Sequence, residues 1–224
     1  QPAQPAPTLE DFERAEIIVR AVANVTPVLH SNALTEITGV EVLMKAENLQ
    51  RTGAYKLRGA YHRMTKLTPA ERKKGVIAAS AGNHAQGVAL GAKRLGTQAI
   101  IVMPTTTPSV KIEAVKALGG EVVLHGDSLD EARAHAHERA EREGLVFVHP
   151  YDDAAIIAGQ GTANATIVWE ANGFGFVGVV EVMEARCPGV LVSDLVIIGT
   201  VAVDEVDAQT QWSSYPSPAN DRVM

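Results

Sequence analysis

Cysteine is almost absent from the sequence, and so are long uncharged apolar runs. The single cysteine, Cys187, has no partner for an intramolecular disulfide. No apolar stretch reaches the roughly 20 residues that a membrane-spanning helix needs, and no basic start followed by an apolar run resembles a signal peptide. We therefore expect a cytoplasmic protein that has neither a disulfide framework nor a membrane partner.

An excess of basic residues is also absent. The formal net charge is -6, and the Lys and Arg residues are dispersed along the chain. This charge gives no general attraction for nucleic acid, which is therefore not an expected partner. With 46% hydrophobic and 21% charged residues, the 224-residue chain is typical of a soluble protein with one large domain or two small ones.

Short apolar runs alternate with helical stretches from Gly75 onward. The runs VIAAS, AIIVMP, EVVLHG and LVFVHP lack a clean polar alternation, which favours strands of a parallel sheet covered by helices on both faces. A capping signal at Thr8 predicts a helix over residues 9–23, and Asp152 and Asp153 open another that ends at the glycines of 159–161. Two more strands are expected within GFGFVGVVEVM and VLVSDLVIIGTVAV.

Lys56 lies in the stretch TGAYKLRGA, behind a turn and ahead of an expected helix. A lysine amine becomes a nucleophile when burial or neighbouring cations suppress its charge. Tyr55 and Leu57 provide apolar flanks, and Arg58, if it lies close, would disfavour the ammonium form. The alternative is that Lys56 is one of many solvated lysines on a helix surface.

The stretch SAGNHAQG lies where an apolar strand passes into a helix. Such a junction directs unpaired backbone N–H groups at one point, which makes a site for a carboxylate or phosphate. Asn83 adds an amide that can donate or accept a hydrogen bond. The alternative is a plain strand-to-helix turn in which Asn83 caps the helix.

A third stretch, AGQGT at residues 158–162, has two glycines in a helical context. These glycines let another backbone or a ligand come close, and taken alone they indicate a packing feature. His135 and His137 lie two apart on an expected helix and so point to different sides, which gives no metal site.

Together and in this order, TGAYKLRGA, SAGNHAQG and AGQGT resemble the threonine ammonia-lyase (threonine dehydratase) branch of the fold type II pyridoxal-phosphate enzymes, which includes serine racemase. MKAENLQ, VMPTTTPSVKIEAVKALGGEVV and HPYDD extend the similarity over residues 9–163. The resemblance implies an α/β fold with two parallel-sheet, three-layer domains, of which the larger is incomplete here. The expected parts are a larger domain from residues 1–71 and 150–224, and a smaller one from residues 72–149.

The resemblance also implies a cofactor and a reaction. The enzyme would use pyridoxal 5'-phosphate to convert L-threonine to 2-oxobutanoate and ammonia, and L-serine to pyruvate. Lys56 would hold the cofactor covalently and, once released, remove the substrate Cα proton. Asn83 would hydrogen-bond to the ring hydroxyl oxygen. The substrate carboxylate would be bound by the backbone N–H groups of Ser80, Ala81, Gly82, Asn83 and His84.

Ala81 distinguishes two activities within this family. Racemases of this type carry a serine at this place as a second base, and alanine cannot move a proton. Elimination is therefore favoured over racemisation or β-replacement. The product would distinguish these activities: an oxo acid indicates elimination, D-serine indicates racemisation and a sulfide adduct indicates β-replacement.

The sequence departs from the family in its last third. A run of four glycines that holds the cofactor phosphate is expected near residues 182–185, where this chain reads VMEA. The alternatives are therefore a non-catalytic or truncated remnant, or nucleotide binding through GFGFVG, which matches GxGxxG but precedes a strand. An incomplete larger domain would leave apolar surface uncovered, so a homo-oligomer, a dimer or a tetramer, is expected.

Overall fold

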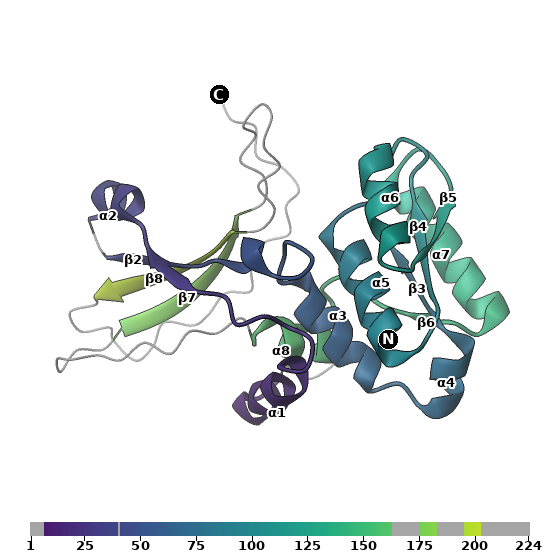
Figure 1. The fold of residues 1–224 in the computed structure, drawn as a ribbon, viewed down its shortest axis with the longest axis horizontal. Helices are drawn as coiled ribbons and strands as arrows, with labels where there is room; N and C mark the ends of the chain where they lie inside the picture. Colours follow the sequence, from purple (N-terminus) through teal and green to yellow (C-terminus); the bar gives the residue numbers. More distant parts are fainter. Residues whose placement is uncertain (1–6, 40, 163–174, 183–194, 203–224) are drawn as a thin grey trace, which may run out of the picture.

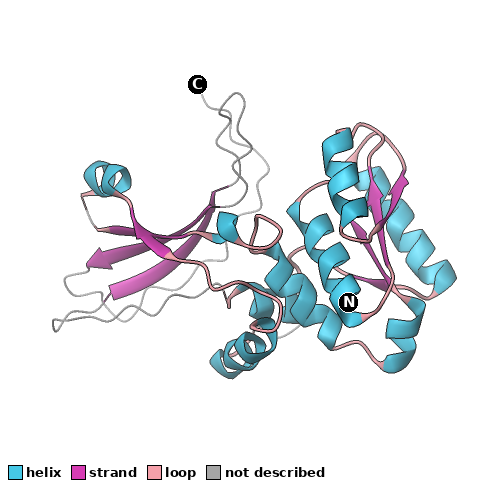
Figure 2. Ribbon diagram, viewed as in Figure 1, coloured by secondary structure: helices cyan, strands magenta, loops and turns pink. Residues whose placement is uncertain are grey.

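The computed structural model describes residues 7–39, 41–162, 175–182 and 195–202. These residues form two sheets, with helices between and around them (Figures 1 and 2). The helices of the described part are α1 (Leu9–Val19), α2 (Asn32–Thr38), α3 (Lys56–Thr65), α4 (Pro69–Lys74), α5 (Asn83–Leu95), α6 (Ser109–Ala117), α7 (Leu129–Glu143), α8 (Ala154–Gln160) and the 3-10 helix η1 (Glu47–Leu49). Its strands are β1 (Val28–His30), β2 (Val42–Lys45), β3 (Val76–Ala79), β4 (Ala99–Met103), β5 (Glu121–Leu124), β6 (Val146–Phe147), β7 (Gly175–Val182) and β8 (Leu195–Ala202).

The sheet β5-β4-β3-β6 is parallel throughout, as the apolar runs predict. The chain moves outward from β3 through β4 to β5, and α7 then returns it to β6 on the other side of β3. Strand order therefore reverses between β3 and β6. In open α/β sheets, ligands bind beyond the carboxyl ends of the strands at such a switch point.

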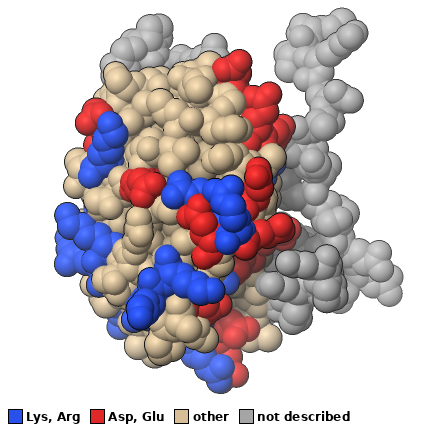
Figure 3. Space-filling view, turned by 90° about the vertical axis from the view of Figure 1, so that its right-hand side faces the viewer, with Lys and Arg blue, Asp and Glu red and all other residues tan. Residues whose placement is uncertain are grey.

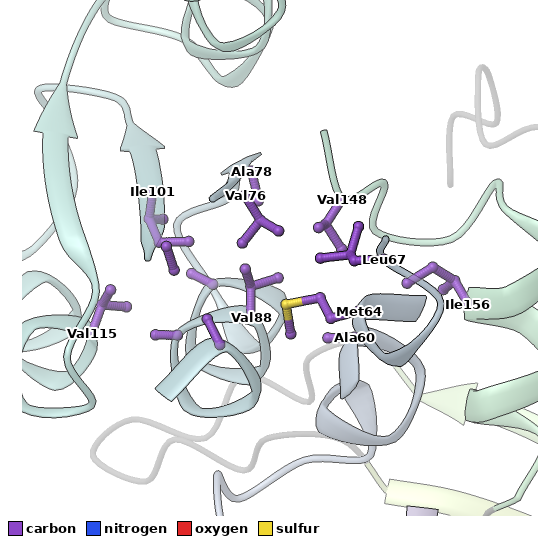
Figure 4. Packing of buried hydrophobic residues seen from close by; sticks show 14 of the residues in the cluster. Ala60, Met64, Leu67, Val76, Ala78, Val88, Ile101, Val115, Val148 and Ile156 are labelled. Carbon is purple, nitrogen blue, oxygen red and sulfur yellow. The ribbon is translucent and has the colours of Figure 1, made fainter. Parts of the chain in front are cut away.

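Helices cover both faces of this sheet, which confirms the three-layer arrangement expected for this part. On one face, α7 presents small residues that pack on the strands, namely Ala132, Ala136 and Ala140. The opposite face carries the larger core, in which side chains of α3 and α5 meet β3 and β4 (Figure 4). Its labelled members include Ala60, Met64, Val76, Ala78, Val88 and Ile101. Helix α3 thus shares a core with the parallel sheet.

Charged side chains of both signs are mixed on the face of the molecule that lies beyond this sheet (Figure 3). Helix α7 lies on this side, and its arginines pair with carboxylates along the same helix, Arg133 with Asp130 and Arg139 with Glu143. Exposed pairs of this kind contribute little to stability. Within the described ranges, no helix combines the length and apolar composition that crossing a membrane requires.

The second sheet, β1-β2-β8-β7, is antiparallel at each of its described pairs. The α/β class is confirmed, while these strand directions differ from the expected second parallel sheet. His30 pairs with Leu43, so the connection through α2 leaves and re-enters at the same end of the sheet. A parallel pair would need a crossover to the opposite end. Val182 and Leu195 are paired in the same way.

Local signals fix most of the predicted helix ends. Thr8 caps α1 in a capping box with Asp11, although the helix ends at Val19 rather than near residue 23. Asp153 caps α8 through bonds from the backbone N–H groups of Ala155 and Ile156. The described part of GFGFVG, from Gly175 onward, lies inside strand β7. This part therefore does not form a phosphate-binding loop between a strand and a helix. Residues 183–185, where the glycine run was expected, lie outside the described residues.

Glycines let α3 pack closely between α5 and α8. A Cβ on Gly159 of α8 would lie 2.8 Å from the Arg58 carbonyl oxygen and 2.8 Å from Gly59 Cα. A Cβ on Gly87 of α5 would lie 3.0 Å from the Leu57 nitrogen. One glycine from each of the three sequence stretches, Gly59, Gly87 and Gly159, therefore serves helix packing around α3, as the packing interpretation of AGQGT predicts.

Replacing Gly159 by alanine should destabilise the fold. The new Cβ would clash with the α3 backbone, which cannot move aside as a flexible side chain can. We expect a loss of about 1 to 3 kcal/mol in the free energy of unfolding, measured by urea denaturation. Gly82→Ala is the control, because a Cβ there meets nothing within 4 Å. Equal stabilities of the two variants would contradict the packing account.

Candidate active site

Lys56 is the first residue of α3. The side chain is half-buried, and its Nζ lies 4.9 Å from the centroid of the Tyr55 ring. Leu57, the next residue, is fully buried. Lys56 is therefore partly covered, beside an aromatic ring and a buried residue.

The loop after β3 begins at Ser80, whose backbone N–H donates to the Val102 carbonyl at 3.1 Å. Its hydroxyl accepts from the Gly82 N–H at 3.2 Å. Gly82 is the N-cap of α5 and has no side chain with which to cap this helix. Asn83 is the first helical residue, so the alternative in which Asn83 caps the helix is wrong. The start of a helix directs backbone N–H groups toward the preceding loop, where such groups can bind an anion.

His84 ties this loop to the end of β6 across the switch point. Its ring is buried, and Nε2 lies 2.9 Å from the Val148 carbonyl oxygen. Burial lowers the pKa of His84 to about 4, a net value to which the charge of Lys56 contributes and which the Val148 bond opposes. The ring is therefore neutral at neutral pH, with Nε2 donating to the carbonyl. Nδ1 is buried and finds no hydrogen-bond partner among the described residues.

The three sequence stretches meet around the first turn of α3. Gly87 of α5 lies against the Lys56–Leu57 peptide, and the Lys56 charge acts on the His84 ring. The third stretch, AGQGT, contacts α3 at Thr162, whose carbonyl oxygen accepts a hydrogen bond from Arg58 at 3.1 Å. Lys56 and the loop that holds Ser80, Ala81, Gly82, Asn83 and His84 are thus neighbours.

Arg58 has a different role from the one that its position beside Lys56 suggests. Its Nε and Nη2 donate to the two carboxylate oxygens of Glu47, each at 2.8 Å. The structure directs this charge to a buried carboxylate instead of the Lys56 amine. Glu47 is fully buried and was not a candidate from the sequence, because no local pattern links it to an arginine eleven residues later.

A second cation lies beside this pair. Burial opposes the charged form of Glu47, but the bonds and charge of Arg58 and the Thr26 hydroxyl lower the pKa of Glu47 overall. Burial lowers the pKa of Lys45, with Arg58 adding to the effect and Glu47 opposing it. Lys45 Nζ donates to the Thr26 carbonyl at 2.6 Å. Glu47 is therefore an anion at neutral pH, held by donors on several sides.

His84 makes stability depend on pH. Its pKa falls from 6.5 in the unfolded chain to about 4 when folded, so the unfolded chain binds the proton more readily and stability is lost as pH falls from 6.5 toward 4. His84→Gln can still donate to Val148 but cannot titrate. Between pH 7 and pH 5 the native chain should lose about 2 kcal/mol more than this variant in urea denaturation. Parallel pH dependences would show that His84 is not buried as a neutral ring.

Comparison with known proteins places this geometry in a family. The profile of the family described as pyridoxal-phosphate dependent enzyme matches residues 19–183. An L-threonine ammonia-lyase of Thermotoga maritima is 48% identical over 161 residues, which are 72% of this chain and 40% of that protein. The structure of processed threonine deaminase isoform 2 from Solanum lycopersicum matches with a TM-score of 0.63 and 46% identity, over 72% of this chain and 46% of that chain.

A serine racemase of Dictyostelium discoideum matches with a TM-score of 0.64 and 35% identity, over 70% of this chain and 51% of that chain. This chain thus spans between 40% and 51% of the length of these three proteins. The resemblance seen in the sequence is confirmed, and so is the fold class. With a profile match over most of its residues, the chain belongs to the family of pyridoxal-phosphate-dependent enzymes.

Proposed function

We propose that this protein is a pyridoxal-phosphate-dependent ammonia-lyase that converts L-threonine to 2-oxobutanoate and ammonia, and L-serine to pyruvate. The observation that carries the proposal is the placement of the half-buried Lys56 beside the start of α5 and the neutral ring of His84. The threonine ammonia-lyase and threonine deaminase to which the chain is similar support the same reaction.

The described residues fit the cofactor by the chemistry of their donors. Lys56 supplies the primary amine that a pyridoxal aldehyde requires, and Asn83 supplies an amide for the ring hydroxyl oxygen. Gly82 leaves open space where a side chain would otherwise project, since a Cβ there meets nothing within 4 Å. The residues expected to bind the cofactor phosphate follow Val182 and lie outside the described residues.

Each residue of the site then has a task. When bound, pyridoxal phosphate supplies an electron sink for the charge that develops at the substrate Cα. Lys56 removes the Cα proton, and the first backbone N–H groups of α5 bind the substrate carboxylate. His84 holds this helix end to Val148 while adding no positive charge. The loss of the β-hydroxyl then gives the oxo acid and ammonia after hydrolysis.

Racemisation is the second candidate function, because the chain is 35% identical to the serine racemase of Dictyostelium discoideum. A racemase needs a second proton donor on the other side of the substrate Cα. In the loop between β3 and α5, Ala81 stands where racemases of this type carry that serine, and its methyl group cannot transfer a proton. We therefore favour elimination.

The reaction can be tested with purified chain, added pyridoxal phosphate and L-threonine. We expect 2-oxobutanoate, detected by a coupled dehydrogenase. Lys56→Ala should lower the rate at least about 100-fold, because it removes the proposed proton acceptor. The control is Lys74→Ala, an exposed lysine of α4. If L-serine gives D-serine and no oxo acid, racemisation replaces the proposed reaction. If neither D-serine nor an oxo acid forms, the result favours a non-catalytic chain.

We also propose that the protein is a cytoplasmic homo-oligomer. Large apolar side chains of the described part are exposed, among them Val25 at 95%, Ile37 at 80% and Ile17 at 72%. Where such side chains adjoin one another, they are typically covered in an assembly. Sedimentation should show a dimer or tetramer, and a sharp boundary at monomer mass would contradict the proposal.

A further inference from the structure

Arg58 joins the helix that carries Lys56 to three other segments of the chain. Its guanidinium binds both oxygens of Glu47 at 2.8 Å, the Thr162 carbonyl at 3.1 Å and the Asn24 carbonyl at 3.4 Å. The side chain of Arg58 is 8% exposed and that of Glu47 is 0% exposed. A bidentate, desolvated pair of this kind fixes both orientation and distance.

Glu47 is held equally firmly from the other side. The Thr26 hydroxyl donates to its Oε1 at 2.5 Å. The Thr26 carbonyl in turn accepts from Lys45 Nζ at 2.6 Å. Because its acceptors are satisfied by donors from separate segments, Glu47 is a fixed point against which Arg58 can hold α3.

The first turn of α3 depends on contacts of this kind. Tyr55 at its N-cap makes no side-chain capping bond, so the turn lacks the usual local support. Gly87 of α5 lies against the Leu57 nitrogen on one side, while Arg58 holds the helix toward Glu47. Residues two apart on a helix point to different sides, so Arg58 acts on Lys56 through the backbone and not by contact.

We propose that the Glu47–Arg58 pair positions Lys56, by fixing the first turn of α3 so that the amine stays beside the start of α5. Arg58 and Glu47 are thus positioning residues, and neither needs to touch the substrate. This inference rests on the proposed function in assigning chemistry to Lys56. The position of the amine itself can be measured without the cofactor.

The same helix provides a matched control. Arg63, in the last turn of α3, pairs with Asp153 at 2.8 Å, and their side chains are 23% and 17% exposed. Asp153→Asn removes this pair, while asparagine still caps α8. Glu47→Gln removes the pair of Arg58 with the same loss of one negative charge. Neither change adds an amine that would confuse the labelling of lysines.

The test is competitive acetylation of the cofactor-free chain by acetic anhydride, with mass-spectrometric mapping of each lysine. The rate at Lys56 is divided by the rate at the exposed Lys74 of the same molecules. In Glu47→Gln this ratio should rise at least about threefold, because a loosened turn exposes the amine. In Asp153→Asn it should stay at the native value. Equal ratios in the two variants would overturn the proposal.

A second variant covers the case in which Glu47→Gln does not fold, as judged by urea denaturation. Thr26→Val removes only one hydroxyl bond to Glu47 and should move the ratio in the same direction by a smaller amount. No change in this variant would then overturn the proposal.

Cofactor trapping on the same proteins separates this inference from the proposed function. Borohydride reduction after addition of pyridoxal phosphate should label Lys56 in the native chain. It should require about 10- to 100-fold more cofactor in Glu47→Gln than in Asp153→Asn. If the acetylation ratio changes as expected but the native chain is never labelled at Lys56, the positioning role stands and the proposed function fails. Equal trapping in both variants would overturn the positioning role.

Discussion

The buried ion pair between Glu47 and Arg58 is the interaction on which the arrangement around Lys56 depends. It connects η1 to α3 and is almost completely buried, with side-chain exposures of 0% for Glu47 and 8% for Arg58. Buried ion pairs add little net stability compared with apolar packing, but losing one partner leaves an uncompensated charge. The pair therefore specifies one geometry for the start of α3, and its value to the protein is positional.

Close helix packing complements this polar contact. Gly59 and Gly159 let α3 and α8 approach to backbone distance, and Gly87 does the same between α3 and α5. The first turn of α3 is thus confined from several sides, and it faces the N-terminus of α5 at the switch point of the parallel sheet. The Lys56 amine and the start of α5 lie together because the glycine packing contacts and one ion pair converge there. The proposed chemistry requires this proximity.

The sequence predicts the features that local residues decide. Apolar runs and glycine stops predict the parallel sheet, and Asp153 marks the start of α8 because its side chain caps the next residues. Lys56 and Asn83 were identified through stretches that resemble a known family, and the structure brings their elements together. Their chemical roles remain predictions.

Features decided by distant residues were not predicted. The hydrogen bond from His84 to Val148 joins residues that are 64 apart, and no local sequence pattern predicts it. Arg58 was expected to act on its neighbour Lys56, whereas its partner Glu47 comes from another element. The antiparallel directions in the second sheet likewise depend on which strand ends meet, as with His30 and Leu43.

A double-mutant cycle on Glu47 and Arg58 tests the central claim most directly. Urea denaturation would be measured for the native chain, Glu47→Gln, Arg58→Met and the double variant. If the pair holds α3 as described, each single change should cost about 3 to 5 kcal/mol, and the double change should cost at least about 2 kcal/mol less than their sum. Costs that simply add would show that the two side chains act independently and would contradict the account.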